Sequence, residues 1–486
     1  MKNYLLLTVA AVGMLMASCS KTTDDGGTIN PPATDNVVTV TGDITANTTW
    51  TADKIYLLKG NVYVTSNATL TIAEGTLIKG DKASKGSLVI TRGAKIMAVG
   101  TADKPIVFTS NVAAGGRSQG DWGGIILLGK APNNQGESIA IEGISDATDK
   151  GKYGGTDAND NSGTMKYVRI EYAGIPLSPD NEINGLTFGS VGAGTTIDYI
   201  EVYRSGDDAF EWFGGTVNCK HLIAIDSWDD DFDTDYGFSG KIQFGIAQRL
   251  AATADVSGSN GFESDNNGVG DNKTPQTSAI FSNMTILGPR EVASGGPSIN
   301  ANFQHAAQIR RNSAISIFNS VFAGNVQGVF YDDGLPGIGD ANSSSVNLTG
   351  GKAIFANNLV VGTGSNTVKA SNATIQTAIT TFLNTGLNNT FDNAIYAGAI
   401  YTDPYKFGAD IASNTSSYTR QGIPNFTQVA TSQALTGAAY TNTKVADAFF
   451  DKTGTFKGAF GTSDWSAGWA SYNPQQLPYT APGAVK

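Results

Sequence analysis

The segment TLTIAEGTLIKG, at residues 69–80, points to the fold class because SLVITRGAKIMA, at residues 87–98, repeats its pattern. Four positions coincide at an offset of 18 residues: Leu70 with Leu88, Ile72 with Ile90, Gly75 with Gly93, and Ile78 with Ile96. Both copies contain short alternating apolar runs around a glycine turn, which is typical of strands. Repetition of so short a unit predicts a solenoid, in which each turn of the chain buries its inward side chains against the next.

Two further repeats extend this pattern along the chain. YVRIEYAG (167–174) matches YIEVYRSG (199–206) at an offset of 32, and IFSN, IFNS and IFAN begin at Ile280, Ile317 and Ile354, a step of 37. Their asparagines and serines are expected to stack as a polar ladder at a turn. Short strands with variable connections predict an all-β, right-handed parallel β-helix; a β-propeller or sandwich suits such uneven spacing less well.

The expected domain organisation has four parts. Residues 1–18 are a signal peptide, 19–45 a flexible tether, 46–400 the parallel β-helix, and 401–486 a C-terminal cap with loops that lacks the repeat. Trp465 and Trp469 are expected to pack in that cap, because solenoids need covered ends. The insertion SDATDKGKYGGTDANDNSG (145–163) is expected to form a loop on one face.

The N-terminus is typical of an exported lipoprotein. One lysine precedes an apolar run from Tyr4 to Met16, and Met16-Ala17-Ser18-Cys19 resembles a bacterial lipobox, in which the cysteine is acylated. Cys19 is therefore the expected lipidation site and the expected anchor to the outer membrane, the alternative being an ordinary signal peptide. The following SKTTDD resembles the surface-export signal of Bacteroidetes lipoproteins.

Composition excludes several function classes. The net charge is −11, which argues against a nucleic acid partner, because that partner is also negative. Two histidines, His221 and His305, are too few for a typical zinc site. The remaining cysteine, Cys219, has no disulfide partner once Cys19 carries lipid, so we expect it to be a buried apolar residue.

Acidic residues are concentrated in GDDAFEWFGG (206–215) and DSWDDDFDTDYG (226–237), although only 15% of the chain is charged. Aligning the Phe-acid pairs at residues 210, 232 and 262 gives steps of 22 and 30 residues, so Glu211, Asp233 and Glu263 should stack on adjacent strands, about 4.8 Å apart. Such columns repel unless something neutralises them. The phenylalanines at the same three positions should point inward.

Calcium is the cofactor that this block favours, because calcium takes 6–8 oxygen ligands from carboxylates, amides and carbonyls. Asn266 and Asn267 follow the block and offer further oxygens. The alternatives are an acid and base pair for glycoside hydrolysis, and solvated turns capped by Asx hydrogen bonds. The candidate metal ligands are Asp207, Asp208, Glu211, Asp229, Asp230, Asp231, Asp233, Asp235, Glu263 and Asp265.

Aromatic residues alternate with these acids and indicate sugar binding, in which rings stack on sugars and carboxylates accept hydroxyl hydrogen bonds. The candidate ligand-binding residues are Trp212, Trp228, Tyr236 and Arg204. The Gly-His-Gly and Arg-Ile-Lys motifs of polygalacturonases are absent, which argues against hydrolysis. A lyase would need a basic residue near the acids, for which Arg204, Lys220, Arg310 and Arg311 are candidates.

The chain resembles a family of Bacteroidetes outer-membrane lipoproteins in GSLVITRGAKIMAVGTADKPIVFTS, GDWGGIILLG, the acidic block and the terminal TFKGAFGTSDWSAGW. The resemblance covers nearly everything after about residue 45 and implies a fold similar to that of pectin lyases and polygalacturonases. It implies no activity, and some relatives work beside outer-membrane nutrient receptors. We therefore expect a surface-exposed, lipid-anchored protein that binds a glycan; the alternatives are a polysaccharide hydrolase or lyase, and an accessory subunit of an outer-membrane transporter.

Overall fold

The computed structural model describes residues 36–144, 149–178, 181–294, 296–406 and 422–486. Cys19, the signal peptide and most of the expected tether lie outside these residues. The expected tether does not extend to residue 45, because strand β1 begins at Val37. Its alternating Val and Thr residues have high strand propensity and pair with the next strand.

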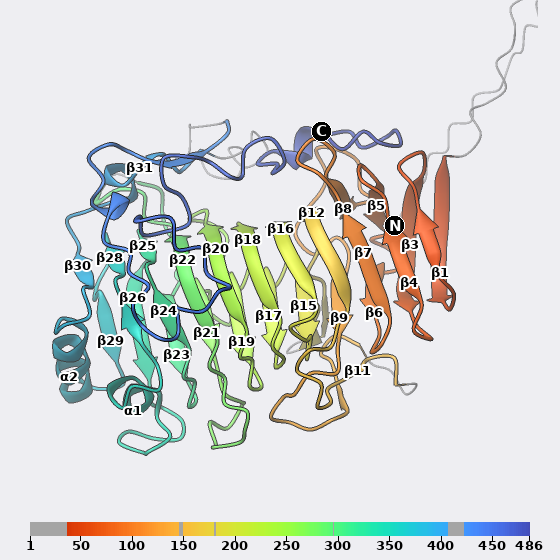
Figure 1. The fold of residues 1–486 in the computed structure, drawn as a ribbon. Helices are drawn as coiled ribbons and strands as arrows, with labels where there is room; N and C mark the ends of the chain where they lie inside the picture. Colours follow the sequence, from red (N-terminus) through yellow and green to blue (C-terminus); the bar gives the residue numbers. More distant parts are fainter. Residues whose placement is uncertain (1–35, 145–148, 179–180, 295, 407–421) are drawn as a thin grey trace, which may run out of the picture. The chain divides into compact units, whose positions relative to one another are not determined.

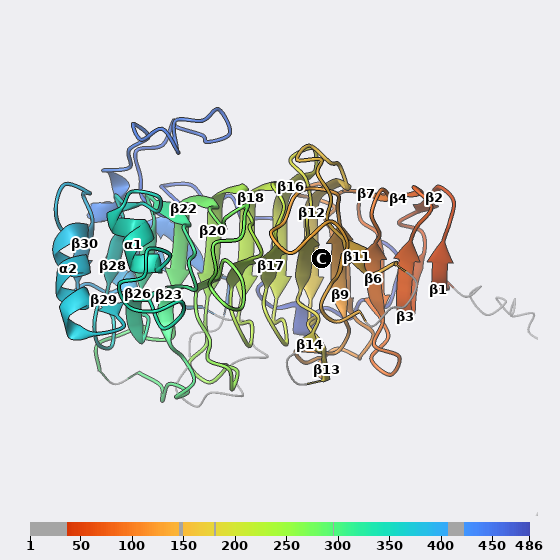
Figure 2. The ribbon, with the colours of Figure 1, turned by 90° about the horizontal axis from the view of Figure 1, so that it is seen from below.

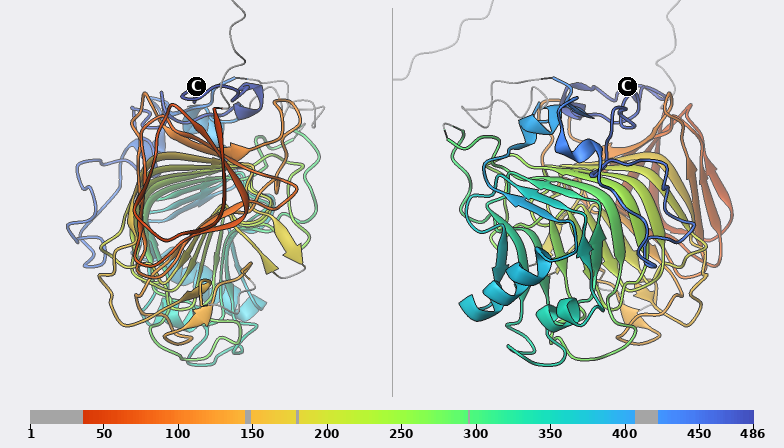
Figure 3. Two further views of the ribbon diagram at one scale, coloured as in Figure 1. Left: turned by 90° about the vertical axis from the view of Figure 1, so that its right-hand side faces the viewer. Right: turned by 60° about the vertical axis from the view of Figure 1, so that its left-hand side comes forward.

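Residues 36–486 form one compact unit built as a right-handed parallel β-helix. Figure 1 shows its strands side by side along the axis, and Figure 3 (left) shows the closed cross-section from the β1 end. The strands form three faces. The first face contains β2 (Thr48–Trp50), β4 (Thr69–Ile72), β7 (Lys95–Val99), the first halves of β12 (Gly163–Glu171), β16 (Thr196–Tyr203), β18 (Asn218–Ile225), β20 (Lys241–Gln248) and β22 (Ile280–Leu287), and then β24 (Ser316–Phe318) and β27 (Phe355–Ala356).

The other two faces follow in the same order along the axis. The second contains the first parts of β1 (Val37–Ile44) and β3 (Ile55–Val64), β5 (Leu77–Gly80), β8 (Ile106–Ser110), the second halves of the five long strands, β25 (Val321–Ala323), β28 (Leu359–Val361) and β30 (Thr390–Asp392). The third contains the ends of β1 and β3, β6 (Ser87–Ile90), β9 (Gly124–Leu128), β15 (Leu186–Gly189), β17 (Phe210–Phe213), β19 (Phe232–Asp235), β21 (Phe262–Ser264), β23 (His305–Arg310), β26 (Gln327–Asp332) and β29 (Val368–Ala370).

Smaller elements decorate this coil. Antiparallel pairs join β10 (Ile139–Ala140) to β11 (Lys152–Tyr153), β13 (Pro176–Ser178) to β14 (Asn181–Glu182), and β31 (Tyr401–Asp403) to β32 (Asn425–Gln428). The helices are α1 (Ser344–Thr349) and α2 (Ala373–Leu383), with 3-10 turns at Ala397–Ala399, Gln433–Leu435 and Pro474–Gln476. None of the helices in the described ranges has the length and apolar character needed to cross a bilayer.

The observed registers confirm some repeats and correct others. β12 and β16 pair 32 residues apart, as expected. The offset of 18 between residues 69–80 and 87–98 is not a register, because Leu70 pairs with Ile96 and Leu88 pairs with Val62. The two segments are instead successive strand-turn-strand units on different faces. The step of 37 is also inexact, since Phe281 pairs with Ile317 and Ile317 with Phe355, steps of 36 and 38.

A ladder of side chains follows the corner where the long strands pass from the first to the second face. Tyr167, Tyr199, His221 and Phe244 have positive φ there, and their rings stack with centroids 4.4, 4.2 and 5.2 Å apart. Asn283, Asn319 and Asn357 continue the positive-φ corner, a conformation in which asparagine is enriched. The polar ladder includes a bond from Asn319 Nδ2 to Ser282 Oγ of 3.2 Å.

The C-terminal segment returns along the outside of the β-helix, over the second face (Figures 1 and 2). Trp469 is buried there, and Trp465 stacks on Phe460 with ring centroids 4.8 Å apart. Trp465 and Trp469 therefore pack as expected, but the described part of residues 401–486 covers the side of the β-helix and is not the cap of its last turn. The last turn of the solenoid is covered by α2, whose Ile379 and Leu383 join the core.

Candidate functional site

A column of acids runs across the third face, as the sequence predicts. Glu211 of β17 pairs in register with Asp233 of β19, which pairs with Glu263 of β21. The alternate residues face the core: the rings of Phe210 and Phe232 lie 5.7 Å apart and nearly parallel. The phenylalanine stack thus fixes the register that places the carboxylates on the outer surface, at the ~4.8 Å spacing of neighbouring strands.

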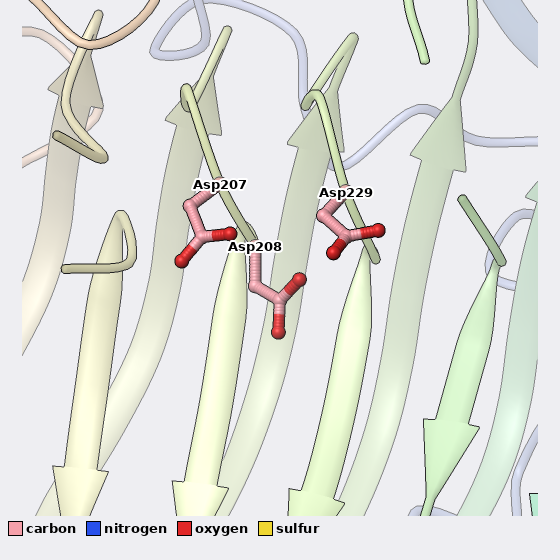
Figure 4. A group of neighbouring side chains, drawn as sticks. All are labelled: Asp207, Asp208 and Asp229. Carbon is pink, nitrogen blue, oxygen red and sulfur yellow. The ribbon is translucent and has the colours of Figure 1, made fainter. Parts of the chain in front are cut away.

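More carboxylates lie in the turns that lead into these strands. Figure 4 shows Asp207 and Asp208 before β17 and Asp229 before β19, with Asp208 between the other two. One oxygen from each of these three residues lies within 4.8 Å of the others. A second group with the same property contains Asp208, Glu211 and Asp233. Asp208 therefore belongs to both groups, and together they form what we call the acidic face.

Only some of the carboxylate oxygens of the acidic face accept hydrogen bonds. Asp208 Oδ1 accepts from the Asp230 amide at 2.7 Å, Asp229 Oδ2 accepts from Ser257 Oγ at 2.7 Å, and Glu211 accepts from Asn184 Nδ2. Asp229 Oδ1 and Asp233 Oδ1 are buried atoms without a hydrogen-bond partner. A buried carboxylate oxygen without a hydrogen bond lowers the stability of the folded state. A cation bound to these two atoms would remove that loss.

No ion pair within the described ranges reaches the carboxylates of Asp207, Asp208, Glu211, Asp229, Asp230, Asp233 or Asp235. Burial, followed by repulsion between neighbouring acids, raises the pKa of six of them well above the usual range: Asp207, Asp208, Glu211, Asp230, Asp233 and Asp235. Burial also raises the pKa of Asp229 to about 6. The folded protein therefore strongly resists carrying all these charges without a cation.

Two arginines bound the acidic face on the β23 side. Arg310 Nε pairs with Asp265 Oδ1 at 2.9 Å and its Nη2 with Glu263, while Arg311 Nη1 pairs with Asp265 Oδ2 at 2.7 Å. Glu263 and Asp265, expected as metal ligands, are thus already neutralised in part. Of the suggested basic residues, these arginines lie beside the acids, whereas the Lys220 amine lies over the Phe449 ring.

Asp231 is not part of the acidic face, which corrects its prediction as a metal ligand. Its side chain is fully buried and pairs with Arg249 Nε at 3.0 Å. Arg249 also donates to the carbonyls of Ser227 and Asp229, and to that of Asn260 at 3.0 Å. The pair therefore holds the turn that presents Asp229 and Asp230. Sequence reasoning missed Arg249, because nothing in its local sequence links it to that turn.

The predicted ligand-binding residues have different fates. The prediction of Trp212 as a ligand-binding residue is wrong, because it is fully buried, with its ring stacked 5.3 Å from those of Phe188 and Phe238. It shares the inward parity of Phe210 on β17. Arg204 is also buried, and its Nε lies 3.3 Å from Asp226 Oδ2. Trp228 remains 38% exposed, beside Asp229 in the same turn.

Tyr236 is half-buried at the end of β19, next to Asp235, whose Oδ1 accepts the Tyr236 amide at 2.6 Å. Its ring tilts against Phe213, 5.6 Å away. Phe213 in turn packs with Ile141, Ile144 and Tyr153 of the segment that crosses β9 and β15. The acidic face is therefore bordered by an apolar wall on its β15 side and by arginines on its β23 side.

Two asparagines that sequence reasoning missed connect the acids to the scaffold. Asn184 contacts Glu211, and its own Oδ1 is buried without a partner. The backbone N–H of Asn260 donates to Asp230 Oδ1 at 2.5 Å, and the side-chain Oδ1 of Asn260 accepts from His305 Nδ1 at 3.0 Å. Asn184 occurs in the short run NEINGL, which is a weak loop signal, so the sequence alone gave no reason to choose it.

Comparison with known proteins identifies the architecture. A family described as "Pectate-lyase like beta helix domain" matches residues 42–334, a range that contains the whole acidic face. A search of curated proteins found no match. The crystal structure of Dettilon tailspike protein matches 67% of this chain at 9% sequence identity with a TM-score of 0.22. The matched region spans 62% of that tailspike chain.

Proposed function

The chain belongs to the family of pectate-lyase-like β-helix domains, and we propose that its acidic face binds calcium and, through it, a glycan. The family membership supports a glycan-related role. The two buried, unpartnered oxygens, Asp229 Oδ1 and Asp233 Oδ1, carry the metal part of the proposal. Asp229 belongs to one, and Asp233 to the other, of the two carboxylate groups that share Asp208. A divalent cation at each group would satisfy these oxygens and offset the repulsion.

The donor set favours calcium over other metals. Calcium binds oxygen ligands in flexible geometry, and the acidic face offers carboxylates together with the Asn184 amide oxygen. Zinc would prefer nitrogen or sulfur. His305 Nε2 instead accepts from Lys369 Nζ at 3.2 Å, and Cys219 is buried in the core. Neither side chain is therefore available as a metal ligand at the acidic face.

A glycan fits as the ligand that completes the calcium coordination. Sugar hydroxyls or carboxylates would supply the oxygens that the protein does not, since calcium takes 6–8 of them. Exposed Trp228 stands beside Asp229 and offers a ring for stacking. Arg310 and Arg311 at the other border would attract acidic groups of the same chain.

A polysaccharide hydrolase or lyase is the second candidate. The pKa of Asp229, raised to about 6 by burial, would let this carboxyl hold a proton near neutral pH, as a general acid does. A binding protein and an enzyme would both take up the same glycan. The formation of products distinguishes the two functions. The expected anchor through Cys19, location at the outer membrane surface, and a transporter partner remain part of the proposal.

The experiment that tests this function is glycan binding at controlled calcium. Pectic, alginate and host glycans are titrated into the protein in millimolar calcium and again in excess chelator. We expect binding of an acidic glycan only with calcium, loss of that binding in Asp233→Asn, and no new reducing ends or unsaturated products. Equal binding in chelator would refute the role of the cation, and turnover that disappears in Asp229→Asn would favour the enzyme.

A further inference from the structure

The two ends of the β-helix differ in how they are covered. At the C-terminal end, α2 places Ile379 and Leu383 on the core. Among the residues that the structure describes, the first helix begins only at Ser344, so none of the described helices covers the N-terminal end. There β1 pairs with β3 on one side, and no described strand pairs with its other side. β1 is the outermost strand on the right in Figure 1 and faces the viewer in Figure 3 (left).

The exposed part of β1 is suited to strand pairing. Residues 37–41 read VVTVT, five β-branched residues without charge or proline. Such residues have the highest strand propensity, and an uncharged edge lacks the lysines and prolines that natural edge strands use against association. Gly42, with φ of 67°, then turns the chain onto the third face and ends the straight segment.

The inward side of this segment is apolar and incompletely covered. Val38 and Val40 pair in register with Tyr56 and Leu58, both of the buried core, so they continue its inward rows. Val38 is nevertheless 38% exposed. The end of the β-helix thus presents unpaired backbone groups and two valines whose far sides lack the neighbours that every inner strand has.

We propose that a second copy of this chain pairs with β1, antiparallel and across a two-fold axis at Thr39. Each copy's backbone donors and acceptors along residues 37–41 would then bond to those of the other. In this register Val37 faces Thr41, Val38 faces Val40, and Thr39 faces Thr39. The inward valines of one copy meet those of its partner and extend both cores.

Self-complementarity is the reason for choosing a second copy over another partner. An isologous contact needs a surface that matches itself, and a symmetrical, uncharged segment does so in antiparallel register. It brings no like charges opposite each other, which would be unfavourable. The two-fold axis also places both apolar ends face to face. The pairing lies far from the acidic face and is independent of calcium or glycan binding.

Cysteine cross-linking tests the register in full-length protein purified in detergent. Residues directly opposite in an antiparallel pair have Cα atoms roughly 4.5–5.5 Å apart, which suits a disulfide. We expect Thr39→Cys to form a disulfide-linked dimer under mild oxidation. The fully exposed Asp103→Cys is the matched control and should form no disulfide-linked dimer. Neither should the wild type, whose Cys219 is buried and whose Cys19 is the expected lipidation site. Equal cross-linking at both positions, or none at Thr39→Cys, would overturn the pairing.

A charge exchange tests the same axis without a covalent bond. Thr39→Lys and Thr39→Glu each place like charges opposite one another, so each alone should weaken the dimer roughly fivefold or more. An equal mixture of the two should restore dimers, because the facing charges are then opposite. Sedimentation over a concentration series measures this, with circular dichroism showing that each variant is folded. A monomeric wild type, or a mixture no better than its components, would contradict the proposal.

Discussion

At the scale of single residues, Asp208 has the largest expected effect on calcium, because its carboxylate belongs to both groups of the acidic face. Asp208→Asn should reduce calcium affinity at least tenfold, since a charged ligand is lost from both. In chelator the variant should melt at or above the wild-type temperature, because one buried repulsive charge is gone. Calorimetric titration and thermal melts measure both effects. Exposed Asp103→Asn is the control, and an Asp208→Asn variant that binds calcium like this control would contradict the site.

Asp231→Asn should lower stability rather than calcium affinity, although Asp231 directly follows Asp229 and Asp230 in the sequence. It removes the buried partner of Arg249 and leaves an uncompensated charge, which costs roughly 3–5 kcal/mol of folding free energy. We expect the loss in urea denaturation with calcium and with chelator alike. A variant as stable as the wild type would show that Arg249 does not depend on Asp231.

Residue identities were predictable where strand parity fixes direction, and less so in turns. Glu211 and Asp233 alternate with inward phenylalanines, so their outward position follows from the two-residue period. The same period should have placed Trp212 inside. Asp229, Asp230 and Asp231 are consecutive residues in a turn, where no period applies. Which of them faces Arg249 depends on a contact 18 residues away, and only the structure reveals it.

At the scale of the strands, the acidic columns of β17, β19 and β21 should make stability depend on pH. Burial raises the pKa of Asp229 to about 6 and, despite the ion pair with Arg310, that of Glu263 to about 8, against roughly 4 for both when unfolded. Between these values the folded state holds protons that the unfolded chain has released. The free energy of unfolding should therefore fall as pH rises from about 4 to about 8.

Urea denaturation in chelator at several pH values checks this dependence. Calcium should flatten the curve near pH 7–8, because the bound cation favours the ionised carboxylates. A free energy of unfolding in chelator that rises steadily over this range would contradict the pKa directions. Asp103, which is fully exposed, makes Asp103→Asn a control that should follow the wild-type curve.

Registers were predictable only where a repeat marks equivalent strands. The step of 22 between Phe210 and Phe232 is a true register because both phenylalanines occupy one inward row. The offset of 18 failed because a β-helix repeats a similar strand-turn-strand pattern at successive corners within one coil. Leu70 and Leu88 look equivalent in sequence, yet lie on different faces. Spacing alone does not separate these cases.

At the scale of the whole molecule, the expected lipid anchor determines where the β-helix works. Cys19 lies outside the described residues, so fractionation must test it. We expect wild-type protein in the membrane fraction and Cys19→Ala in the soluble fraction, because the acyl chains would be the attachment. Cys219→Ala should remain attached, since that thiol is buried in the β-helix. A Cys19→Ala protein that stays with membranes would refute lipidation as the anchor.

The central claim is that a divalent cation neutralises the acidic face, and the melting temperature of the wild type tests it most directly. At a calcium concentration a hundredfold above its dissociation constant, binding of one cation to the folded state adds roughly 2.7 kcal/mol. Cooperative unfolding of a chain this long would then shift by roughly 3 °C. Sodium chloride of equal ionic strength should shift the melting temperature much less. A double variant with both Asp208→Asn and Asp233→Asn should show no calcium-dependent shift. A wild-type melting temperature indifferent to both calcium and chelator would contradict the account.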